Sequence, residues 1–194
     1  MGTDKAFLTY QSKPFVKIIT EEMRQITDDL TVVIGNKKKS DFAVVLDPKV
    51  RILEDKQELG NPIGGMLTGF ETAIHDHVAV LACDSPLVRN QVVKLLFKAA
   101  RNYDAAVPIW EDRNTEPLCA VYNKELAKQA ATDALRMGKI GPKNLLAQLE
   151  NVNYVDVSKI RKFDPSLASF LNVNSREDYA RLLGGNKNPT PKSR

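Results

Sequence analysis

The feature that most constrains the fold is the repeated alternation of short β-branched segments with segments of helical periodicity. Residues 30–34 form a β-branched run that stops at a Gly-Asn pair, which is typical of a buried strand. Residues 77–83 form the clearest strand, and Pro86 prevents its continuation. Apolar residues at helical spacing accompany these strands, for example along residues 14–28. Such alternation predicts an α/β layered fold with a mostly parallel sheet.

The rest of the chain continues this pattern within one domain. A turn around Asp112 predicts a hairpin, and hence at least one antiparallel strand. Ser175 and Asp178 have the spacing of a capping box at the start of a last helix. We expect a single domain over residues 1–183 and a disordered tail over residues 184–194, which is rich in Gly, Asn, Pro and Lys. The other expected helices cover residues 64–74, 91–101, 125–135 and 143–149, and the other expected strands cover residues 51–53, 104–109, 118–122 and 153–157.

The composition excludes several classes of protein. Of the 194 residues 43% are hydrophobic, and the net charge is only +4, so the chain does not belong to the disordered class. The longest apolar run covers residues 78–83, whereas a membrane-spanning helix needs about 20 residues, so we expect no membrane partner. Cys83 and Cys119 are too few for a disulfide framework, and with no signal peptide they predict a cytoplasmic protein. We interpret the basic residues 37–39 as a solvated turn and expect no nucleic-acid partner.

Asp84 is the strongest candidate for a functional side chain. It follows the clearest strand at its carboxyl end, and ligands of open α/β sheets bind outside the carboxyl ends of the strands. One carboxylate in a crevice is typical of a Mg²⁺ site, where substrate phosphates and waters complete the coordination. The alternative is that Asp84 caps the turn that begins at Ser85, and the pattern alone leaves both interpretations open.

Lys5 and the pair Gly64 and Gly65 are weaker candidates. Glycines at the start of a helix let the backbone approach an anion, but a tight turn with positive φ is their more frequent use. Lys5 lies beside Gly2 and is suited to neutralising a phosphate, although a lysine this close to a terminus is usually frayed. Cys83 is expected to be a buried small apolar residue.

A set of short motifs runs in a fixed order along nearly the whole chain. The motifs are Met1-Gly2-Thr3-Asp4-Lys5-Ala6, Leu53-Glu54-Asp55, Asn61-Pro62-Ile63-Gly64-Gly65, Leu81-Ala82-Cys83-Asp84-Ser85-Pro86, Glu116-Pro117-Leu118 and Phe170-Leu171-Asn172-Val173-Asn174-Ser175. Each is weak alone, but their order and spacing resemble the MobA-type molybdenum cofactor guanylyltransferases, within the wider nucleotidyltransferase superfamily. The last motif, followed by an acidic helix start, favours the molybdenum branch. The resemblance implies a three-layer α/β/α Rossmann-like nucleotidyltransferase fold with a mostly parallel mixed sheet.

The resemblance also implies roles for individual residues. Lys5 matches the signature lysine that contacts the phosphates of GTP, and Asp84 matches the aspartate that holds Mg²⁺, so these two are the expected catalytic residues. Asn172 and Asn174 match a pair near the molybdopterin pocket. The further positions that match nucleotide-binding positions of the family are Gly2, Asn36, Asp55, Gly64 and Gly65.

The family signature includes an upstream strand and a glycine loop, Leu-Ala-Gly-Gly-x-Ser-x-Arg, that wraps the base and phosphates of the nucleotide. This sequence starts at the methionine that follows the loop in the family. We interpret this as a start site placed too late, and the alternative is a genuinely shortened protein with altered activity. The sequence does not reveal whether the chain fills the gap left by a missing central strand; strand edges left exposed there would favour dimerisation or aggregation.

The implied reaction transfers GMP from GTP to a molybdopterin-type cofactor and releases pyrophosphate. A terminal phosphate of the acceptor is already anionic, so the transfer needs no general base and relies on positioning, Mg²⁺ and lysine charge. Proteins that assemble molybdoenzymes are further expected partners. The alternatives are a cytidylyl- or adenylyltransferase, a guanylyltransferase for another phosphorylated acceptor, and a non-catalytic protein that binds the nucleotide or the cofactor.

Overall fold

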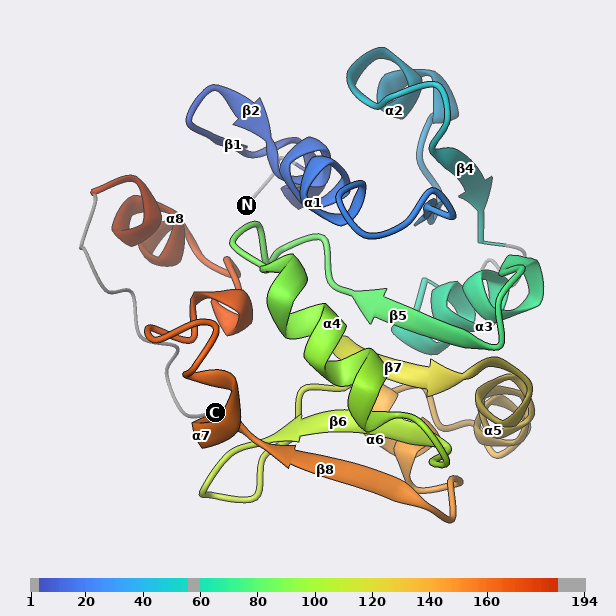
Figure 1. Cartoon of the computed structure of the whole chain (residues 1–194). Coiled ribbons are helices and arrows are strands. Elements are labelled where there is room, and N and C mark those ends of the chain that lie inside the picture. Colours follow the sequence, from blue (N-terminus) through green and yellow to red (C-terminus); the bar gives the residue numbers. More distant parts are fainter. Residues whose placement is uncertain (1–3, 56–59, 185–194) are drawn as a thin grey trace.

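The structure is a computed structural model that describes residues 4–55 and 60–184 (Figure 1). Gly2 and the part of the expected disordered tail beyond Gly184 lie outside the described residues. Most of the expected strands and helices are present within a few residues of their expected bounds.

The strands form a mixed sheet that is divided into two main parts. In one part β3 (Thr31–Ile34) pairs in parallel with β4 (Arg51–Glu54). The other part is four-stranded, with the order β5-β7-β6-β8. In that part β7 is antiparallel to both β5 and β6, while β6 and β8 are parallel, so only β7 is reversed and the expected mostly parallel sheet is confirmed. The bounds are β5 (His77–Leu81), β6 (Ala105–Ile109), β7 (Cys119–Asn123) and β8 (Val152–Asp156).

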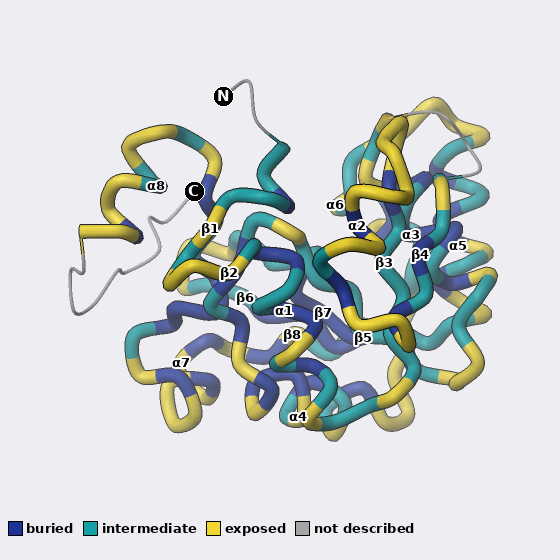
Figure 2. Tube along the Cα trace, turned by 90° about the horizontal axis from the view of Figure 1, so that it is seen from above, coloured by how far each residue is buried: buried dark blue, intermediate teal, exposed yellow. Residues whose placement is uncertain are grey.

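Helices cover both faces of the four-stranded sheet, which gives three layers. Successive strand residues point to opposite faces, and Ala105 and Val107 enter one core while Ala106 enters the other. The first core receives the apolar sides of α3 (Pro62–Thr72), α5 (Lys124–Arg136) and α6 (Pro142–Leu146). The second core receives α1 (Phe15–Met23) and α4 (Asn90–Ala99), and α4 crosses the sheet in Figure 1. Figure 2 shows the buried interior between these layers.

An apolar cleft separates β3 from β5. The two strands are not paired, and among the described residues no strand lies between them. The cleft has a volume of about 890 Å³, and Val33, Gly65 and Val80 are among its lining residues. Its lining also includes Ala82, Cys83 and Asp84, which directly follow β5. Among the described residues, β3 and β5 therefore face each other across a cleft and do not pair.

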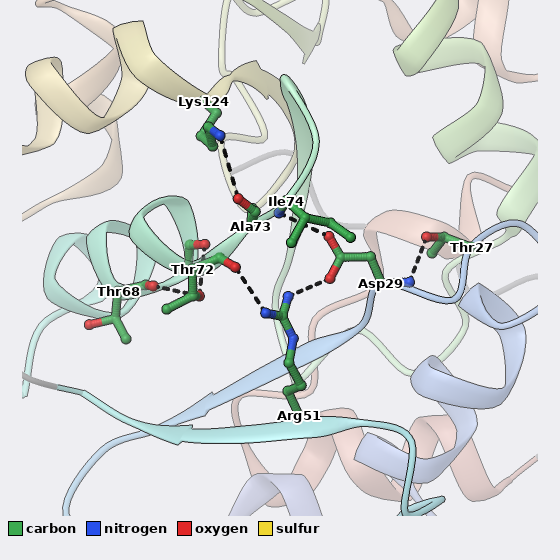
Figure 3. Close-up of polar contacts among 9 residues, drawn as sticks. Thr27, Asp29, Arg51, Thr68, Thr72, Ala73, Ile74 and Lys124 are labelled. Carbon is green, nitrogen blue, oxygen red and sulfur yellow. Dashed lines mark hydrogen bonds and ion pairs between the residues drawn. The ribbon is translucent and has the colours of Figure 1, made fainter.

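A polar cluster joins the two parts of the sheet near the amino ends of their strands (Figure 3). Asp29, two residues before β3, forms an ion pair with Arg51 at the start of β4 and accepts a 3.3 Å hydrogen bond from the amide of Ile74. Arg51 also donates to the carbonyl of Thr72 at the end of α3, at 2.9 Å. Because these contacts cross from the β3–β4 pair to the connection that leads into β5, they hold the cleft at one end.

The two ends of the described chain pack against each other. A short hairpin of β1 (Thr9–Tyr10) and β2 (Lys13–Pro14), which the sequence analysis did not predict, carries the backbone into α1. The last helix, α8 (Arg176–Leu183), docks there, and the hydroxyl of Tyr179 donates to the carbonyl of Thr9 at 2.7 Å. No helix among residues 4–55 and 60–184 is long and apolar enough to cross a membrane. The remaining elements are η1 (Lys5–Phe7), α2 (Lys39–Val45), α7 (Val157–Ile160) and η2 (Ala168–Phe170).

Candidate functional site

Asp84 lies where the sheet rule places a ligand-binding side chain, just beyond the carboxyl end of β5. The backbone of this turn is held on two sides, because the Ala82 amide donates to the carbonyl of Leu118 at 2.9 Å and the Val173 amide donates to the carbonyl of Asp84 at 2.8 Å. The turn itself is closed by a backbone hydrogen bond from Ser85 to Ala82. The Asp84 carboxylate instead faces Lys5. In the contacts described it does not cap the turn that begins at Ser85, which was the alternative interpretation.

Lys5 is fixed in place, in contrast to the frayed terminus that its position suggested. The Asp4 carboxylate accepts a hydrogen bond from the Ala6 amide at 3.1 Å and caps the short helix η1. Ala6 is buried, which anchors the turn. The Lys5 ammonium lies 3.2 Å from Asp84 Oδ2 and 2.6 Å from Asn174 Oδ1. The side chains of Lys5 and Asp84 are 34% and 18% exposed, so the pair is partly shielded from water and open to a ligand.

The segment before α8 brings the two expected asparagines to the same turn. Val173 is fully buried, and its neighbours Asn172 and Asn174 face the turn after β5. The Ser85 hydroxyl donates to the side-chain carbonyl of Asn172, while the side-chain carbonyl of Asn174 accepts from Lys5. The expected capping box at Ser175 is present and fixes where this segment ends. Residues from the first and last parts of the chain thus meet at one point.

A second lysine–carboxylate pair lies at the same edge of the sheet, and sequence reasoning missed it. Lys37 follows β3 at its carboxyl end, and its ammonium lies 2.7 Å from Asp4 Oδ2. The available signal was that Asp4 precedes the signature lysine and that Lys37 lies in the turn after the carboxyl end of a strand. Residues 37–39 are exposed and Lys37 lies in the turn after β3, as the interpretation of a solvated turn expects, but Lys37 also has the contact with Asp4 that the sequence did not predict.

Cys83 lies beside these four charges. It is exposed rather than buried, contrary to expectation, because the chain leaves β5 at Leu81 and residue 83 belongs to the turn outside the sheet. Desolvation by surrounding atoms and the adjacent Asp84 carboxylate raise the pKa of its thiol. Lys37 and Lys5 act in the opposite direction on the same pKa, which places both ammonium groups within electrostatic range of one thiol.

The other expected nucleotide-binding residues are distributed around the cleft. Asp55 directly follows β4; its amide donates to the carbonyl of Ile34 at 2.7 Å and its carboxylate accepts from Thr68 at 3.4 Å. Asn36 is exposed in the turn after β3. The structure brings neither of them into the described contacts of Lys5 and Asp84.

Gly64 and Gly65 lie inside α3, because the helix begins at Pro62 rather than at the glycines. Neither has positive φ, so the tight-turn alternative does not apply to them. The Gly64 amide donates to the side chain of Asn61, the N-cap residue, at 3.0 Å. A Cβ added at Gly65 would lie 3.9 Å from a methyl carbon of Val33, an ordinary contact, and Gly65 lines the cleft.

The carboxylate of Asp84 fits a divalent cation only in a site that the substrate completes. Within residues 4–55 and 60–184, no group of three or more His, Cys, Asp and Glu side chains is arranged to hold a metal ion. Mg²⁺ is commonly held by one or two carboxylates together with substrate phosphates and waters. The donor chemistry of Asp84, next to an ammonium that suits phosphate, fits that arrangement.

Comparisons with known proteins identify the family of the chain. The model of the family described as MobA-like NTP transferase domain matches residues 1–152. A probable molybdenum cofactor guanylyltransferase of Methanosarcina mazei is 33% identical over 186 residues, with 93% of this chain and 83% of that protein covered. Another, of Methanothermobacter thermautotrophicus, is 33% identical over 183 residues, with 92% and 90% covered.

Solved structures give the same result for the fold. The crystal structure of molybdopterin-guanine dinucleotide biosynthesis protein A from Archaeoglobus fulgidus superimposes with a TM-score of 0.80 at 25% identity, over 94% of this chain and 90% of that chain. The 2-C-methyl-D-erythritol 4-phosphate cytidylyltransferase of Thermus thermophilus has a TM-score of 0.71 at 17% identity, over 94% and 93%, which shows a shared nucleotidyltransferase fold.

Proposed function

The chain belongs to the MobA-like NTP transferase domain family, and from this premise we propose that it transfers GMP from GTP to a molybdopterin-type cofactor. The observation that carries the proposal is the contact of Lys5 with both Asp84 and Asn174. It joins the ammonium that we propose for the phosphates, the carboxylate that we propose for the metal and the segment that we propose for the acceptor. The relatives named as molybdenum cofactor guanylyltransferases support the choice of donor and acceptor.

The proposed reaction is a displacement at phosphorus. An oxygen of the acceptor's terminal phosphate forms a bond to the α-phosphorus of GTP, and the bond from that phosphorus to the bridging oxygen of the β-phosphate breaks. The electron pair leaves with pyrophosphate. Because the attacking oxygen is already anionic, no side chain has to remove a proton. This agrees with a site whose described groups are ammonium, carboxylate and amide side chains.

Lys5 supplies positive charge where negative charge develops on the phosphates. Loss of one such preorganised group typically slows a reaction by about 10²–10³-fold. In the described structure the ammonium is oriented by Asp84 and Asn174, so its position is fixed before a ligand arrives. We further propose that Asp84 holds Mg²⁺, which neutralises phosphate charge when it is bound.

Asn172 and Asn174 are proposed to lie at the acceptor end of the site. Their segment is held by the buried Val173 and by the contact of Asn172 with Ser85. An acceptor phosphate that approaches Lys5 from this side meets side-chain amides, which can donate hydrogen bonds to anionic oxygens. Since GTP is a cytoplasmic nucleotide and the described cysteines are free, we place the reaction in the cytoplasm.

The test is a transfer assay with the purified chain, GTP labelled on the α-phosphate, molybdopterin-type acceptor and Mg²⁺, in which the labelled dinucleotide is separated by chromatography. CTP and ATP serve as competing donors, and Asp84→Asn is the control for chemistry at this site. We expect a guanine dinucleotide whose formation is lost in Asp84→Asn. Preferential use of CTP or ATP would assign a different nucleotide specificity. Binding of GTP with no transfer would make the chain a non-catalytic nucleotide-binding protein.

A further inference from the structure

We propose that Lys37 is a second ammonium for the phosphates of the nucleotide, held ready beside Lys5 by the Asp4 carboxylate. The inference rests on the proposed function and assigns to that site a residue that the family resemblance did not supply. Its basis is the arrangement of two neighbouring lysine–carboxylate pairs, Lys5 with Asp84 and Lys37 with Asp4, at the carboxyl ends of β5 and β3.

Asp4 links the two lysines through its two carboxylate oxygens. Oδ1 accepts the Ala6 amide at 3.1 Å, which fixes the carboxylate to the same short helix that carries Lys5. Oδ2 lies 2.7 Å from the Lys37 ammonium. The side chains of Lys37 and Asp4 are 41% and 24% exposed, so the pair is open to a ligand at the surface. The turn that carries Lys5 therefore also orients the Lys37 ammonium.

The stem of Lys37 is also restrained, which lowers the entropy lost on binding an anion. The amide of Lys37 donates to the carbonyl of Gly35 at 2.7 Å in a tight turn. Its ammonium lies 6.0 Å from the ring centroid of Phe42, within the range of a cation–π interaction. Phe42 in turn packs against Phe7 of η1, with ring centroids 4.7 Å apart. The loop after β3 is therefore joined to the turn of Lys5 by both charge and packing.

The charge balance of this edge indicates what Lys37 binds. The two ammonium groups of Lys5 and Lys37 and the two carboxylates of Asp84 and Asp4 give a net charge of zero. If Asp84 held the divalent cation of a bound nucleotide triphosphate, negative charge on the phosphates would still exceed the positive charge of Lys5. Lys37 can supply a second positive charge, because its ammonium can exchange the Asp4 carboxylate for a phosphate oxygen and form an equivalent charge-assisted hydrogen bond.

The variants are Lys37→Met, which removes the charge, Lys37→Arg, which keeps it, and Lys39→Met as a matched control. Lys39 is exposed and lies two residues further along the chain. Lys39→Met therefore removes the same positive charge from nearly the same place as Lys37→Met does. Thermal unfolding of each variant checks the fold. Calorimetric titration measures the Kd of GTP with Mg²⁺ and the Kd of inorganic tripolyphosphate, which reports on phosphate binding without the base.

We expect Lys37→Met to weaken both ligands by about 10–100-fold, which corresponds to one charge-assisted hydrogen bond of about 1.5–3 kcal/mol. Lys37→Arg should restore most of the affinity, and Lys39→Met should change it by less than about threefold. Equal effects of Lys37→Met and Lys39→Met would overturn the assignment of Lys37. So would a wild-type chain that binds neither tripolyphosphate nor GTP.

The same titrations separate the two proposals. A wild-type chain that binds both ligands in a Lys37-dependent manner, but makes no dinucleotide in the transfer assay, supports Lys37 as a phosphate-binding residue and overturns the proposed transferase. A chain that transfers GMP at the same rate and with the same affinity in Lys37→Met overturns the role of Lys37 alone.

Discussion

Replacement of Lys5 by methionine should strengthen the binding of a divalent cation to the nucleotide-free protein. In the described structure the Lys5 ammonium lies 3.2 Å from Asp84 Oδ2, where it occupies the carboxylate that we assign to the metal. A cation that binds Asp84 must therefore displace this ammonium or share the carboxylate with it. Lys5→Met keeps the length of the side chain and removes this competition, while the same variant should slow GMP transfer.

The size of the effect follows from the distance and the exposure. At 3.2 Å and an effective dielectric constant of about 20, the Coulomb attraction is about 5 kcal/mol, which is an upper limit. Fully exposed ion pairs contribute only about 0.2–1 kcal/mol, because water screens the charges. With side chains 34% and 18% exposed, Lys5 and Asp84 fall between these limits, and we take about 1.5 kcal/mol. This predicts roughly tenfold tighter binding of the cation.

The assay is a titration with Mn²⁺ in place of Mg²⁺, in which electron paramagnetic resonance measures the free ion without nucleotide. Lys13→Met is the matched control, since Lys13 forms a 2.7 Å ion pair with Glu21 on the exposed surface and its loss changes the net charge equally. Lys13→Met should leave the Kd of Mn²⁺ nearly unchanged. Unchanged or weaker Mn²⁺ binding in Lys5→Met would refute the idea that the ammonium and the metal compete for Asp84.

Three further predictions concern the same structure. Asp84→Asn should lower the pKa of the Cys83 thiol, which desolvation by surrounding atoms and the Asp84 carboxylate raise, so 5,5′-dithiobis(2-nitrobenzoate) should react several-fold faster with it near pH 8. Asp29→Ala removes the ion pair with Arg51 and should destabilise the fold by about 1.5–3 kcal/mol, seen as a fall in Tm of about 3–12 °C in calorimetry. Burial raises the pKa of Asp178, but hydrogen bonds at the start of α8 outweigh it and lower the net value. The stability that Asp178 contributes is therefore complete above its unfolded pKa of about 3.9 and is lost as the pH falls through the lower pKa of the folded state. The difference in Tm between the wild-type chain and Asp178→Ala should therefore shrink below about pH 4.

The order of strands and helices could be predicted from local patterns because each element has a local signal. The β-branched run that ends at Ile34 and the capping box of Ser175 both mark real boundaries, whereas β5 ends at Leu81, five residues before Pro86. The hairpin of β1 and β2 had no such signal. Its turn uses Gln11 and Ser12 at positive φ, where a Gly or Asn-Gly pair would have identified it.

The candidate site could be predicted only in part, since its contacts join residues that are distant in sequence. The end of β5 identified Asp84, but Lys5 entered through the family resemblance, and no spacing rule connects it to a partner 79 positions away. Asp4 lies in the first motif without an assigned role there, and Lys37 lies in none of the motifs; their contact could not be predicted, because it depends on how the turn of η1 packs on the loop after β3. Cys83 was misplaced for a related reason, since hydropathy extends the strand two residues beyond its last paired position, Leu81.

The pairing of charges at this edge connects the two ligands of the proposed reaction. Without ligands the lysines satisfy Asp84 and Asp4, so a cation gains little from Asp84 alone and a polyanion gains little from Lys5 or Lys37 alone. When a cation takes Asp84, Lys5 becomes available to phosphate, and when phosphate engages the lysines, the carboxylate becomes available to the cation. Each ligand therefore lowers the free-energy cost of binding the other. Because such coupling is reciprocal, the factor by which the nucleotide tightens metal binding equals the factor by which the metal tightens nucleotide binding.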